Sequence, residues 1–373
     1  MATYKEQNKQ NVPHLRFSEF HGEWEKCKLG DIAEFSTARI SSVKLDCKNY
    51  VSTENMLQDF QGVVEAKSVP NETNVISFTC GDILISNIRP YLKKVWKATF
   101  DGGCSSDVFV LQATDTVAKD YLHYAVANDK FINYVMSGAK GVKMPRGDKN
   151  QMRTYQLSLP SIQEQYKIAK LLTLLDERIA TQSKLIEKLE SLIKGLRVSL
   201  MQIENGNIVH LDEIARIYQP QTISSTELTE EGFLVYGANG IIGKYKQYNH
   251  KTEQICITCR GNTCGMVNYT KPMSWITGNA MVINTDEHQN KVCKRYLYHY
   301  LSAYNFNSII SGSGQPQIVR TPLEQLKVPL PTFLEQKQKA TFLDKIQGKI
   351  EISNKTLNLY LQQKQYLLRQ MFI

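Results

Sequence analysis

Apolar residues recur alternately every four and every three positions between residues 161 and 203, with charged side chains between them. This a/d heptad spacing predicts one amphipathic helix with a narrow apolar stripe. At 1.5 Å per residue the helix would be about 60 Å long. A stripe this narrow on so long a helix cannot be buried in one globular core, so it predicts a partner helix. The seam residues are Ile168, Leu172, Leu175, Ile179, Gln182, Ile186, Leu189, Ile193, Leu196 and Leu200.

The partner helix is predicted within the same chain, 171 positions further along, over residues 333–373. The polar break in the seam recurs in register, with Ser353 in place of Gln182. The residues that lead into each helix also match, since Leu159, Pro160, Glu164 and Gln165 correspond to Leu330, Pro331, Glu335 and Gln336. We interpret the chain as an internal duplication. The second seam consists of Leu343, Ile346, Ile350, Ser353, Leu357, Tyr360, Lys364, Leu367 and Met371.

Each helix follows a segment that is typical of an α+β domain, with short apolar strands and then a helix. In the first segment we expect strands over 81–88, 94–100 and 107–112 and a helix over 121–135 that ends at Gly138. In the second we expect a strand and a Gly-rich turn over 233–243, strands over 254–258, 265–269 and 280–284, and a helix over 296–310 that ends at Gly312. The predicted order is domain 1–160, helix 161–203, domain 204–332 and helix 333–373.

The short link after the first helix contains Asn205-Gly206, which is a turn signal. We therefore expect the two helices to run antiparallel as a coiled coil, with the two domains held apart and related by a pseudo-two-fold axis. Gln182 and Ser353 are either plain defects in the seam or a buried polar pair that fixes the register of the helices.

The net charge of +9 favours a nucleic-acid partner but does not require one. Residues 204–332 carry 11 basic and 10 acidic side chains, and residues 1–160 carry 20 and 18, so any DNA surface must be a local patch. The sequence contains no run of about 18 apolar residues, so it predicts no membrane span. Residues 1–11 lack the apolar core of a signal peptide. The eight cysteines are scattered, which is typical of a reduced, cytoplasmic protein.

Catalytic and metal-binding motifs are missing from the sequence. Cys256, Cys259 and Cys264 lack the fourth ligand and second paired motif of a structural zinc site, so we predict no metal. We find no phosphate-binding loop, no Asn/Asp-Pro-Pro-aromatic loop of an amino-methyltransferase and no carboxylate cluster of a nuclease. The sequence therefore predicts that this chain is not itself an enzyme.

Five groups of residues are candidates for DNA contact, because Lys and Arg bind phosphates, Arg pairs with guanine and Gln pairs with adenine. Each group could instead be a solvated loop or a structural hairpin. The first domain contributes the loop residues Arg89, Tyr91, Lys93 and Lys94, and the densest basic stretch with Lys140, Lys143, Arg146 and Lys149. The second contributes Asn239, Lys244, Tyr245 and Lys246 on a predicted Gly-rich turn, Arg260 and Asn262 after a strand, and Gln315, Gln317 and Arg320.

The ordered motifs on this duplicated frame resemble one family, the specificity subunit of type I restriction-modification systems, over essentially the whole chain. The motifs are residues 13–17, 23–25 and 29–32, the Leu-Pro and Glu-Gln pairs before both helices, and residues 237–243 and 314–317. One departure is Lys143-Met-Pro-Arg146, which only loosely matches Gly314-Gln-Pro-Gln317. Equivalent DNA contacts in the two halves are therefore an open question.

The resemblance implies that each globular part is a target recognition domain that reads one half of a bipartite sequence in double-stranded DNA. It implies that the helices set the spacing and dock two adenine methyltransferase subunits, with restriction subunits joining them. It also implies that S-adenosylmethionine, ATP and Mg²⁺ are used by those partners, with no cofactor bound by this chain.

One other function remains as an alternative, because the near-neutral domains would suit a coiled-coil scaffold with two protein-binding domains. A third function, an autonomous methyltransferase or nuclease, fails because the motifs that it needs are missing.

Overall fold

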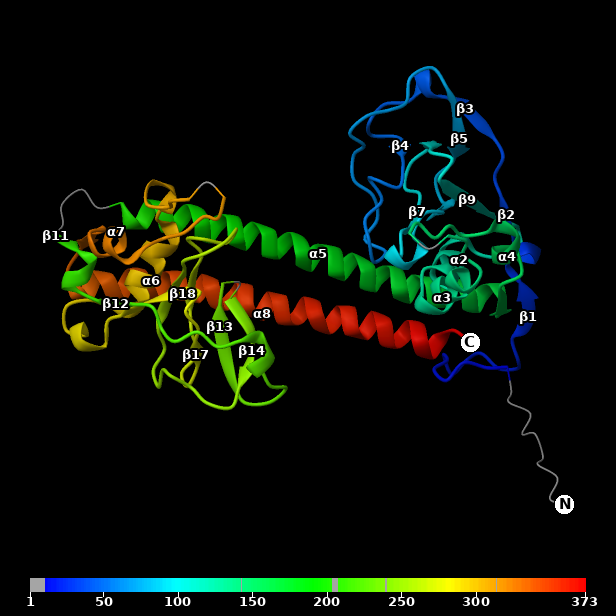
Figure 1. Ribbon diagram of the computed structural model, residues 1–373. Helices are drawn as coiled ribbons and strands as arrows, with labels where there is room; N and C mark the ends of the chain where they lie inside the picture. Colours follow the sequence, from blue (N-terminus) through cyan, green and yellow to red (C-terminus); the bar gives the residue numbers. More distant parts are fainter. Residues whose placement is uncertain (1–10, 142, 203–206, 239, 313) are drawn as a thin grey trace. The chain divides into compact units, whose positions relative to one another are not determined.

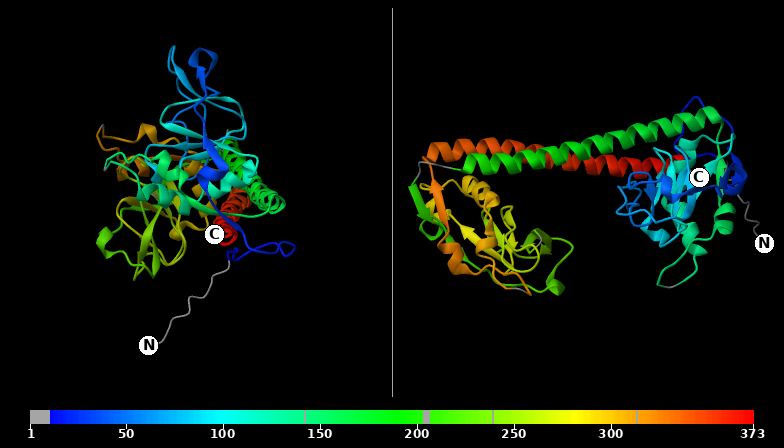
Figure 2. Two further views of the ribbon diagram at one scale, coloured as in Figure 1. Left: turned by 90° about the vertical axis from the view of Figure 1, so that its right-hand side faces the viewer. Right: turned by 90° about the horizontal axis from the view of Figure 1, so that it is seen from above.

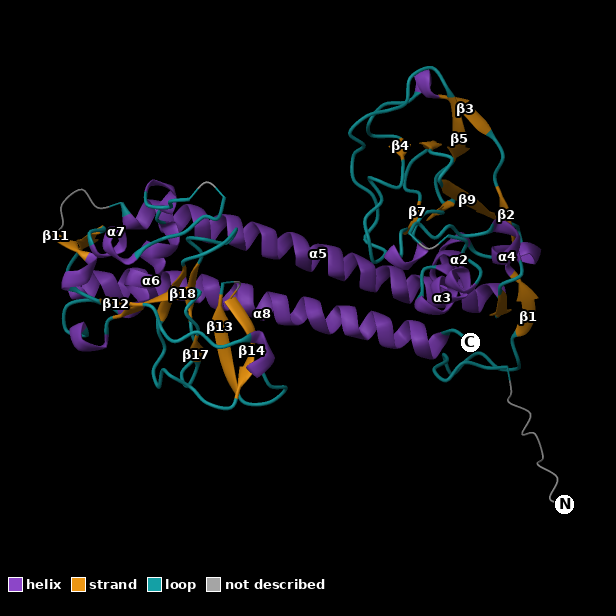
Figure 3. Cartoon of the chain, viewed as in Figure 1, coloured by secondary structure: helices purple, strands orange, loops and turns teal. Residues whose placement is uncertain are grey.

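The computed structural model of the chain (Figure 1) describes residues 11–141, 143–202, 207–238, 240–312 and 314–373. The chain divides into two compact units. Unit 1 is Met1–Gln182 together with Leu357–Ile373, and unit 2 is Ser183–Thr356. Two long helices, α5 (Ile162–Met201) and α8 (Phe333–Met371), each contribute one segment to either unit. Each unit therefore consists of one α+β domain and a piece of both helices (Figure 3).

The described residues of unit 1 form three small sheets. Its strands are β1 (Glu25–Lys28), β2 (Ala33–Phe35), β3 (Arg39–Ser41), β4 (Tyr50–Val51), β5 (Asn74–Phe78), β6 (Ile83–Ser86), β7 (Val95–Lys97), β8 (Gly102–Cys104), β9 (Val108–Ala113) and β10 (Gln156–Leu159). The strand orders are β2-β9-β6-β7, β3-β5-β8-β4 and β1-β10. The strands predicted over 81–88, 94–100 and 107–112 are confirmed as β6, β7 and β9.

The helices of unit 1 cover the β2-β9-β6-β7 sheet. They are α1 (Leu29–Ile32), α2 (Lys119–Val126), α3 (Asp129–Ser137) and α4 (Lys149–Arg153), with 3-10 turns at Ser42–Lys44 and Pro90–Leu92. The single helix predicted over 121–135 is wrong, because the chain breaks at Ala127 and restarts with Asn128 as the N-cap, whose side chain accepts a hydrogen bond from the Phe131 N–H. An N-cap amide stabilises a new helix start, and this outweighed the apolar periodicity.

Unit 2 repeats the first and third of these sheets. Its strands are β11 (Asn207–His210), β12 (Arg216–Tyr218), β13 (Phe233–Gly237), β14 (Gly240–Tyr245), β15 (Ile255–Thr258), β16 (Val267–Tyr269), β17 (Trp275–Ile276), β18 (Ala280–Asn284) and β19 (Lys327–Leu330). The sheet β12-β18-β15-β16 has the strand order and antiparallel pairing of β2-β9-β6-β7, and β11-β19 matches β1-β10. The remaining sheet, β14-β13-β17, differs from β3-β5-β8-β4 in strand number and order, although each contains one parallel pair, β13 with β17 and β4 with β8.

The helices of unit 2 are α6 (Lys294–Ala303) and α7 (Arg320–Glu324), with 3-10 turns at Leu211–Glu213, Ser225–Glu227, Asp286–His288 and Phe306–Ser308. The helix predicted over 296–310 ends early, at Ala303, so this prediction is wrong for its second half. Asn305 caps the following 3-10 turn by accepting a hydrogen bond from the Asn307 N–H, and the helix does not continue to Gly312.

Within each unit, segments of α5 and α8 lie side by side (Figures 1 and 2), and seam residues of both helices share a hydrophobic cluster. In unit 2, Arg197 of α5 donates to Gln347, and Lys339 of α8 donates to the Leu200 carbonyl. Residues later in α5 thus contact residues earlier in α8. The helices are therefore antiparallel, as predicted. In unit 1, Leu172 and Leu175 share a core with Leu367 and Met371. No helix in the described parts of the chain combines the length and apolar character needed to cross a bilayer.

The two polar residues at the break in the seam, Gln182 and Ser353, are partly and fully buried, respectively. Ser353 is 8% exposed and Gln182 is half-buried, and each has an interaction partner. Their role in fixing the register remains a prediction.

A buried glutamine joins each domain to the start of its long helix, which explains the repeated Glu-Gln pair. Gln165 accepts from the Ala118 N–H at 2.8 Å and donates to the Pro160 carbonyl at 2.9 Å. Gln336 accepts from the Cys293 N–H at 2.8 Å and donates to the Pro331 carbonyl at 3.0 Å. Both glutamines are 1% exposed. Each therefore ties the beginning of α2 or α6 to the beginning of α5 or α8.

A second joint in each unit links the domain to both long helices. In unit 1 the Tyr124 hydroxyl of α2 donates to Asp176 of α5 at 2.8 Å, and Asp176 pairs with Lys364 of α8 at 2.6 Å. In unit 2 the position is taken by His299 of α6, which is 0% exposed.

His299 Nε2 lies 2.8 Å from a carboxylate oxygen of Asp344, and its Nδ1 lies 3.2 Å from Nε of Arg197. Because Arg197 can only donate, Nδ1 accepts and the imidazole is neutral. Burial, the largest cause, lowers the pKa of His299 below the ordinary value of 6.5, against the opposing effect of Asp344.

Replacing either buried glutamine is expected to destabilise the protein. Gln165→Met or Gln336→Met leaves a buried backbone N–H and carbonyl without partners, which costs about 1–3 kcal/mol. Urea denaturation followed by circular dichroism measures the free energy of unfolding. Gln163→Met, at an exposed position of the same helix, is the control and should change it by less than about 0.5 kcal/mol. Equal losses from Gln163→Met and Gln165→Met would contradict this role.

Mild acid is expected to weaken the His299 joint. Because the folded-state pKa of His299 lies below 6.5, protons favour the unfolded state, and stability is lost as pH falls below about 6.5. His299→Gln should therefore show a smaller fall in unfolding free energy between pH 7 and pH 5 than the parent chain. Tyr124→Phe is the control, since it breaks the equivalent joint without removing a histidine and should lower stability equally at both pH values. An undiminished fall in His299→Gln would refute the assignment.

Candidate nucleic-acid interface

Two of the basic groups, more than forty residues apart in the chain, come together in unit 1. Residues 140, 141 and 143–147 form a tight hairpin, called hook 1 here. The Arg89 N–H donates to the Pro145 carbonyl at 2.8 Å, and Ile88 forms a β-bridge with Arg146. Hook 1 therefore lies against the loop that follows β6, and Arg89 and Arg146 belong to one surface.

A glycine makes this hairpin possible. Gly141 has a φ of +97°, a conformation that is costly for other residues. A Cβ on it would also lie 3.1 Å from the Met144 carbonyl oxygen. Arg89 itself has a φ of +50°, which is uncommon for a residue with a side chain, so the loop opposite the hook is held by its surroundings.

The basic residues of this surface separate into two sets. Arg89, Tyr91, Lys140, Lys143 and Arg146 are exposed to solvent. Within this set, the Arg146 guanidinium is held by Asp107 at 3.0 Å and is half exposed, and Lys140 lies 3.7 Å from Asp148.

The other lysines point to partners within unit 1. Lys93 pairs with Asp129 at 2.8 Å, and Lys94 donates to the Thr53 carbonyl at 2.6 Å. Lys149 lies over the rings of Phe35 and Phe109. Burial, the largest cause, lowers the pKa of Lys94 and of Lys149. These three side chains are thus less available to a ligand than the exposed set.

Unit 2 brings its candidate groups together in the same way. Residues 311, 312 and 314–318 form a second hairpin, hook 2, in which a β-bridge joins Ser311 and Gln317. The Gly261 N–H donates to the Pro316 carbonyl at 2.9 Å, and Arg260 forms a β-bridge with Gln317. The predicted contact residues Arg260, Asn262, Gln315, Gln317 and Arg320 are all exposed. Arg320 also pairs with Glu324 at 2.6 Å.

The Gly-rich hairpin approaches the same surface by its turn alone. The Ala238 carbonyl accepts hydrogen bonds from the hydroxyls of Thr258 and Thr263. Asn239 lies outside the described residues. The prediction that Lys244 and Tyr245 lie on the turn is wrong. Both lie on strand β14, where Tyr245 pairs with Phe233 and packs on Trp275. Lys246 follows them and is exposed. The alternation of the sheet, not the glycines, therefore sets their direction.

A hollow of about 360 Å³ opens beside hook 2. Polar side chains line much of it, including Gln219, Arg260, Gln317 and Arg320, and Tyr218 contributes its ring. Tyr218 and Gln219 were not among the predicted site residues, because nothing in their local sequence indicates that the end of β12 reaches this surface. Hollows lined by convergent donors and acceptors suit the edge of a polar ligand better than an apolar one.

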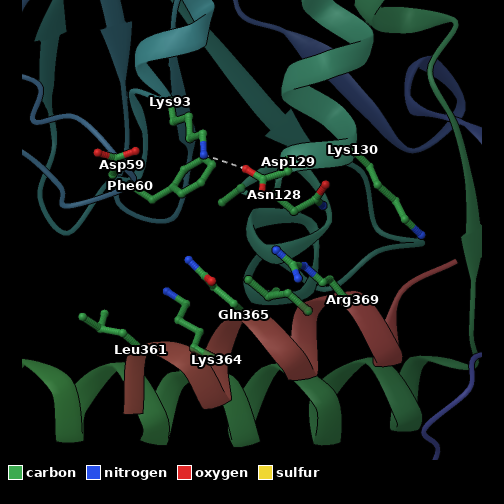
Figure 4. A pocket seen from close by; sticks show the side chains of 12 residues that line it. Asp59, Phe60, Lys93, Asn128, Asp129, Lys130, Leu361, Lys364, Gln365 and Arg369 are labelled. Atoms are coloured by element: carbon green, nitrogen blue, oxygen red, sulfur yellow. Dashed lines mark ion pairs between the residues drawn. The ribbon is translucent and has the colours of Figure 1, made fainter. Parts of the chain in front are cut away.

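A second hollow, of about 160 Å³, lies in unit 1 between the Asp59–Phe60 loop, the start of α3 and the last turns of α8 (Figure 4). Its lysines are already paired within the unit. Lys93 binds Asp129, Lys130 donates to the Phe372 carbonyl, and Lys364 binds Asp176. None of these three lysines is therefore free to bind a phosphate, and Arg369 is the remaining cation that lines the hollow.

Two cysteines of the Cys256-Ile-Thr-Cys259 motif pack as apolar side chains. Cys256 is buried in one cluster of unit 2 and Cys259 in another, and burial raises the pKa of the Cys256 thiol to about 12. Among the described residues, no three His, Cys, Asp or Glu side chains are grouped to hold a metal ion.

Each unit combines an α+β domain, which shares two sheets with the other domain, with antiparallel segments of the long helices and an exposed polar hook. These features define a duplicated recognition scaffold. The family model "Type I restriction modification DNA specificity domain" matches residues 21–191 and again residues 204–361. The chain therefore belongs to the family of type I restriction-modification DNA specificity domains, and the double match confirms the internal repeat.

Relatives with known names agree. The MjaVIII type I restriction enzyme specificity subunit of Methanocaldococcus jannaschii is 25% identical over 415 residues, covering 95% of this chain and 92% of that one. The EcoprrI specificity subunit of Escherichia coli is 32% identical over 140 residues, which are 36% of this chain and 34% of the relative. Among solved structures, the S subunit of a type I restriction-modification system from M. genitalium has a TM-score of 0.69 at 17% identity and covers 97% of this chain and 99% of that one, which shows a shared fold.

Proposed function

We propose that this chain is the DNA sequence-recognition subunit of a type I restriction-modification enzyme and reads a bipartite site in double-stranded DNA. Each unit reads one half of the site through its hook and the neighbouring loop. The observation that carries the proposal is the repetition of this exposed surface, once in each family-matched half of the chain.

The long helices have a second role in this proposal. They set the separation of the half-sites and dock two methyltransferase subunits, and restriction subunits join the same assembly. This is consistent with the exposed apolar side chains that both helices carry outside their seam, among them Leu174, Leu192, Ile352 and Leu359. A solved relative, with a TM-score of 0.54, comes from work on complex assembly in a type I system.

The chemistry belongs to those partners. The partner subunits use S-adenosylmethionine, ATP and Mg²⁺ in the cytoplasm for N6-adenine methylation and DNA cleavage, and this chain supplies binding alone. Purified without partners, it is expected to methylate and cut nothing.

The exposed hook lysines are expected to bind phosphates. In the complex with its methyltransferase subunits, the double variant Lys140→Gln and Lys143→Gln should reduce the slope of log affinity against log salt by about two, since each phosphate contact contributes about 0.9. Fluorescence anisotropy with duplex DNA at several salt concentrations measures the slope. The double variant Lys48→Gln and Lys67→Gln, which removes two exposed charges of the same domain, is the control and should leave the slope unchanged.

Sequencing of methylated adenines in a host that expresses this chain with its partners completes the test. A methylated motif in two parts with a fixed spacer is the expected result. Salt-independent DNA binding together with the absence of such a motif would sink the proposal and favour a protein-binding scaffold.

A further inference from the structure

The two hooks have the same backbone framework. In hook 1 the Arg146 N–H donates to the Lys140 carbonyl at 2.9 Å, and in hook 2 the Gln317 N–H donates to the Ser311 carbonyl at 2.8 Å. The offset between these pairs is 171 residues, the same as between the helix seams. Arg146 and Gln317 therefore occupy equivalent positions.

Hydrogen bonds to the neighbouring loop repeat as well. The proline before each of these residues accepts from the loop at 2.8 Å in unit 1 and 2.9 Å in unit 2. The residue that follows Arg146 or Gln317 donates its N–H to a carbonyl at the end of the neighbouring strand. Gly147 donates to Asn87 and Ile318 donates to Cys259, with an N···O distance of 3.0 Å in both. The backbone on both sides of the side chain is thus fixed in the same way, whatever that side chain is.

The side chains at these equivalent positions differ together with their neighbours. Asn87 N–H donates to the Asp107 carbonyl, and Cys259 N–H donates to the Asn279 carbonyl, so Asp107 and Asn279 are also equivalent. Unit 1 therefore combines an arginine with a carboxylate, and unit 2 combines a glutamine with a carboxamide. Arg146 Nη1 lies 3.0 Å from Asp107 Oδ1. No hydrogen bond joins the Gln317 amide group to another residue within the described part of unit 2.

We propose that Arg146 and Gln317 are equivalent base-reading residues, that Arg146 pairs with a guanine in one half-site, and that Gln317 pairs with an adenine in the other. The inference rests on the proposed function. Asp107 is the positioning residue that aims the Arg146 guanidinium.

The chemistry of the two side chains supports these assignments. Arginine presents two donors that match O6 and N7 of guanine, and glutamine presents a donor and an acceptor that match N7 and N6 of adenine. A carboxylate beside Arg146 repels phosphate but holds the guanidinium in one orientation, which lowers the entropy lost on pairing with a base. The neutral amide of Gln317 needs no such counter-charge, and Asn279, the residue of unit 2 that is equivalent to Asp107, is uncharged.

The test begins from the methylated motif of the parent complex. Arg146→Gln combined with Asp107→Asn should replace a required guanine by adenine at one position of one half-site and leave the other half-site unchanged. Gln317→Arg combined with Asn279→Asp should make the reverse change in the other half-site. Lys143→Gln, on hook 1 but away from its reading position, is the matched control and should weaken binding without changing the motif.

Binding by the purified complex provides a second measurement if a variant no longer methylates. Against a panel of duplexes with single base changes, Arg146→Lys should lose discrimination for guanine at one position by roughly 5- to 150-fold, since Lys keeps the charge but not the fork. Asp107→Ala should lose part of that discrimination at the same position.

Two results would overturn the inference. One is an unchanged motif in both pairs of variants. The other is a loss of affinity for all duplexes alike, including unrelated DNA, which would make Arg146 a phosphate contact. If the parent complex itself neither binds nor methylates a bipartite site, then the proposed function fails, and this outcome is distinct from both.

Discussion

The packing of α5 against α8 is the interaction on which both units depend. In each unit, side chains of both long helices share a hydrophobic cluster with a helix of the domain. In unit 1 the end of α8 and the residue after it, Phe372, enter the core, and Phe372 stacks on Tyr121 of α2 with ring centroids 5.2 Å apart. In unit 2, Tyr296 of α6 packs with Ile193 of α5 and Leu343 of α8. Burial of these apolar surfaces couples the folding of each domain to the pairing of the helices.

The two halves share the contacts that join each domain to the long helices, but they differ in the exposed side chains of their hooks. Gln165 and Gln336 make the same contacts in both units, whereas the second joint uses Tyr124 in one unit and His299 in the other. At the hooks the backbone hydrogen bonds are the same and the outward side chains differ. A fixed backbone with exchangeable side chains is a physical basis for reading two different half-sites with one fold.

Much of this arrangement could be predicted from the sequence, because heptad spacing and a repeat at a constant offset are local signals. They predict the starts of α5 and α8, whereas the turn signal after α5 predicts the antiparallel pairing and short apolar runs predict most strands of the two matching sheets. The sequence alone does not show that the N-cap at Asn128 outweighs the apolar periodicity, so it does not predict the break there. The helix end at Ala303 is not predicted for the same reason.

The site was predictable only as separate segments. That Ile88 meets Arg146, and that Arg260 meets Gln317, depends on β-bridges between residues far apart in the chain. The inward course of Lys149 onto two phenylalanine rings and the ion pair of Asp107 are tertiary contacts without a local signature. Residue type alone therefore overestimated the number of cations that are free to meet DNA.

The central claim is that the paired helices set the distance between the two half-sites. Deletion of one heptad from each helix, residues 181–187 and 352–358, keeps the seams in phase and shortens the pair by about 10 Å. With duplexes whose spacers differ by single base pairs, the complex with its methyltransferase subunits should then prefer a spacer about three base pairs shorter, at about 3.4 Å per base pair. An unchanged spacer preference in a variant that still binds both half-sites would contradict the account.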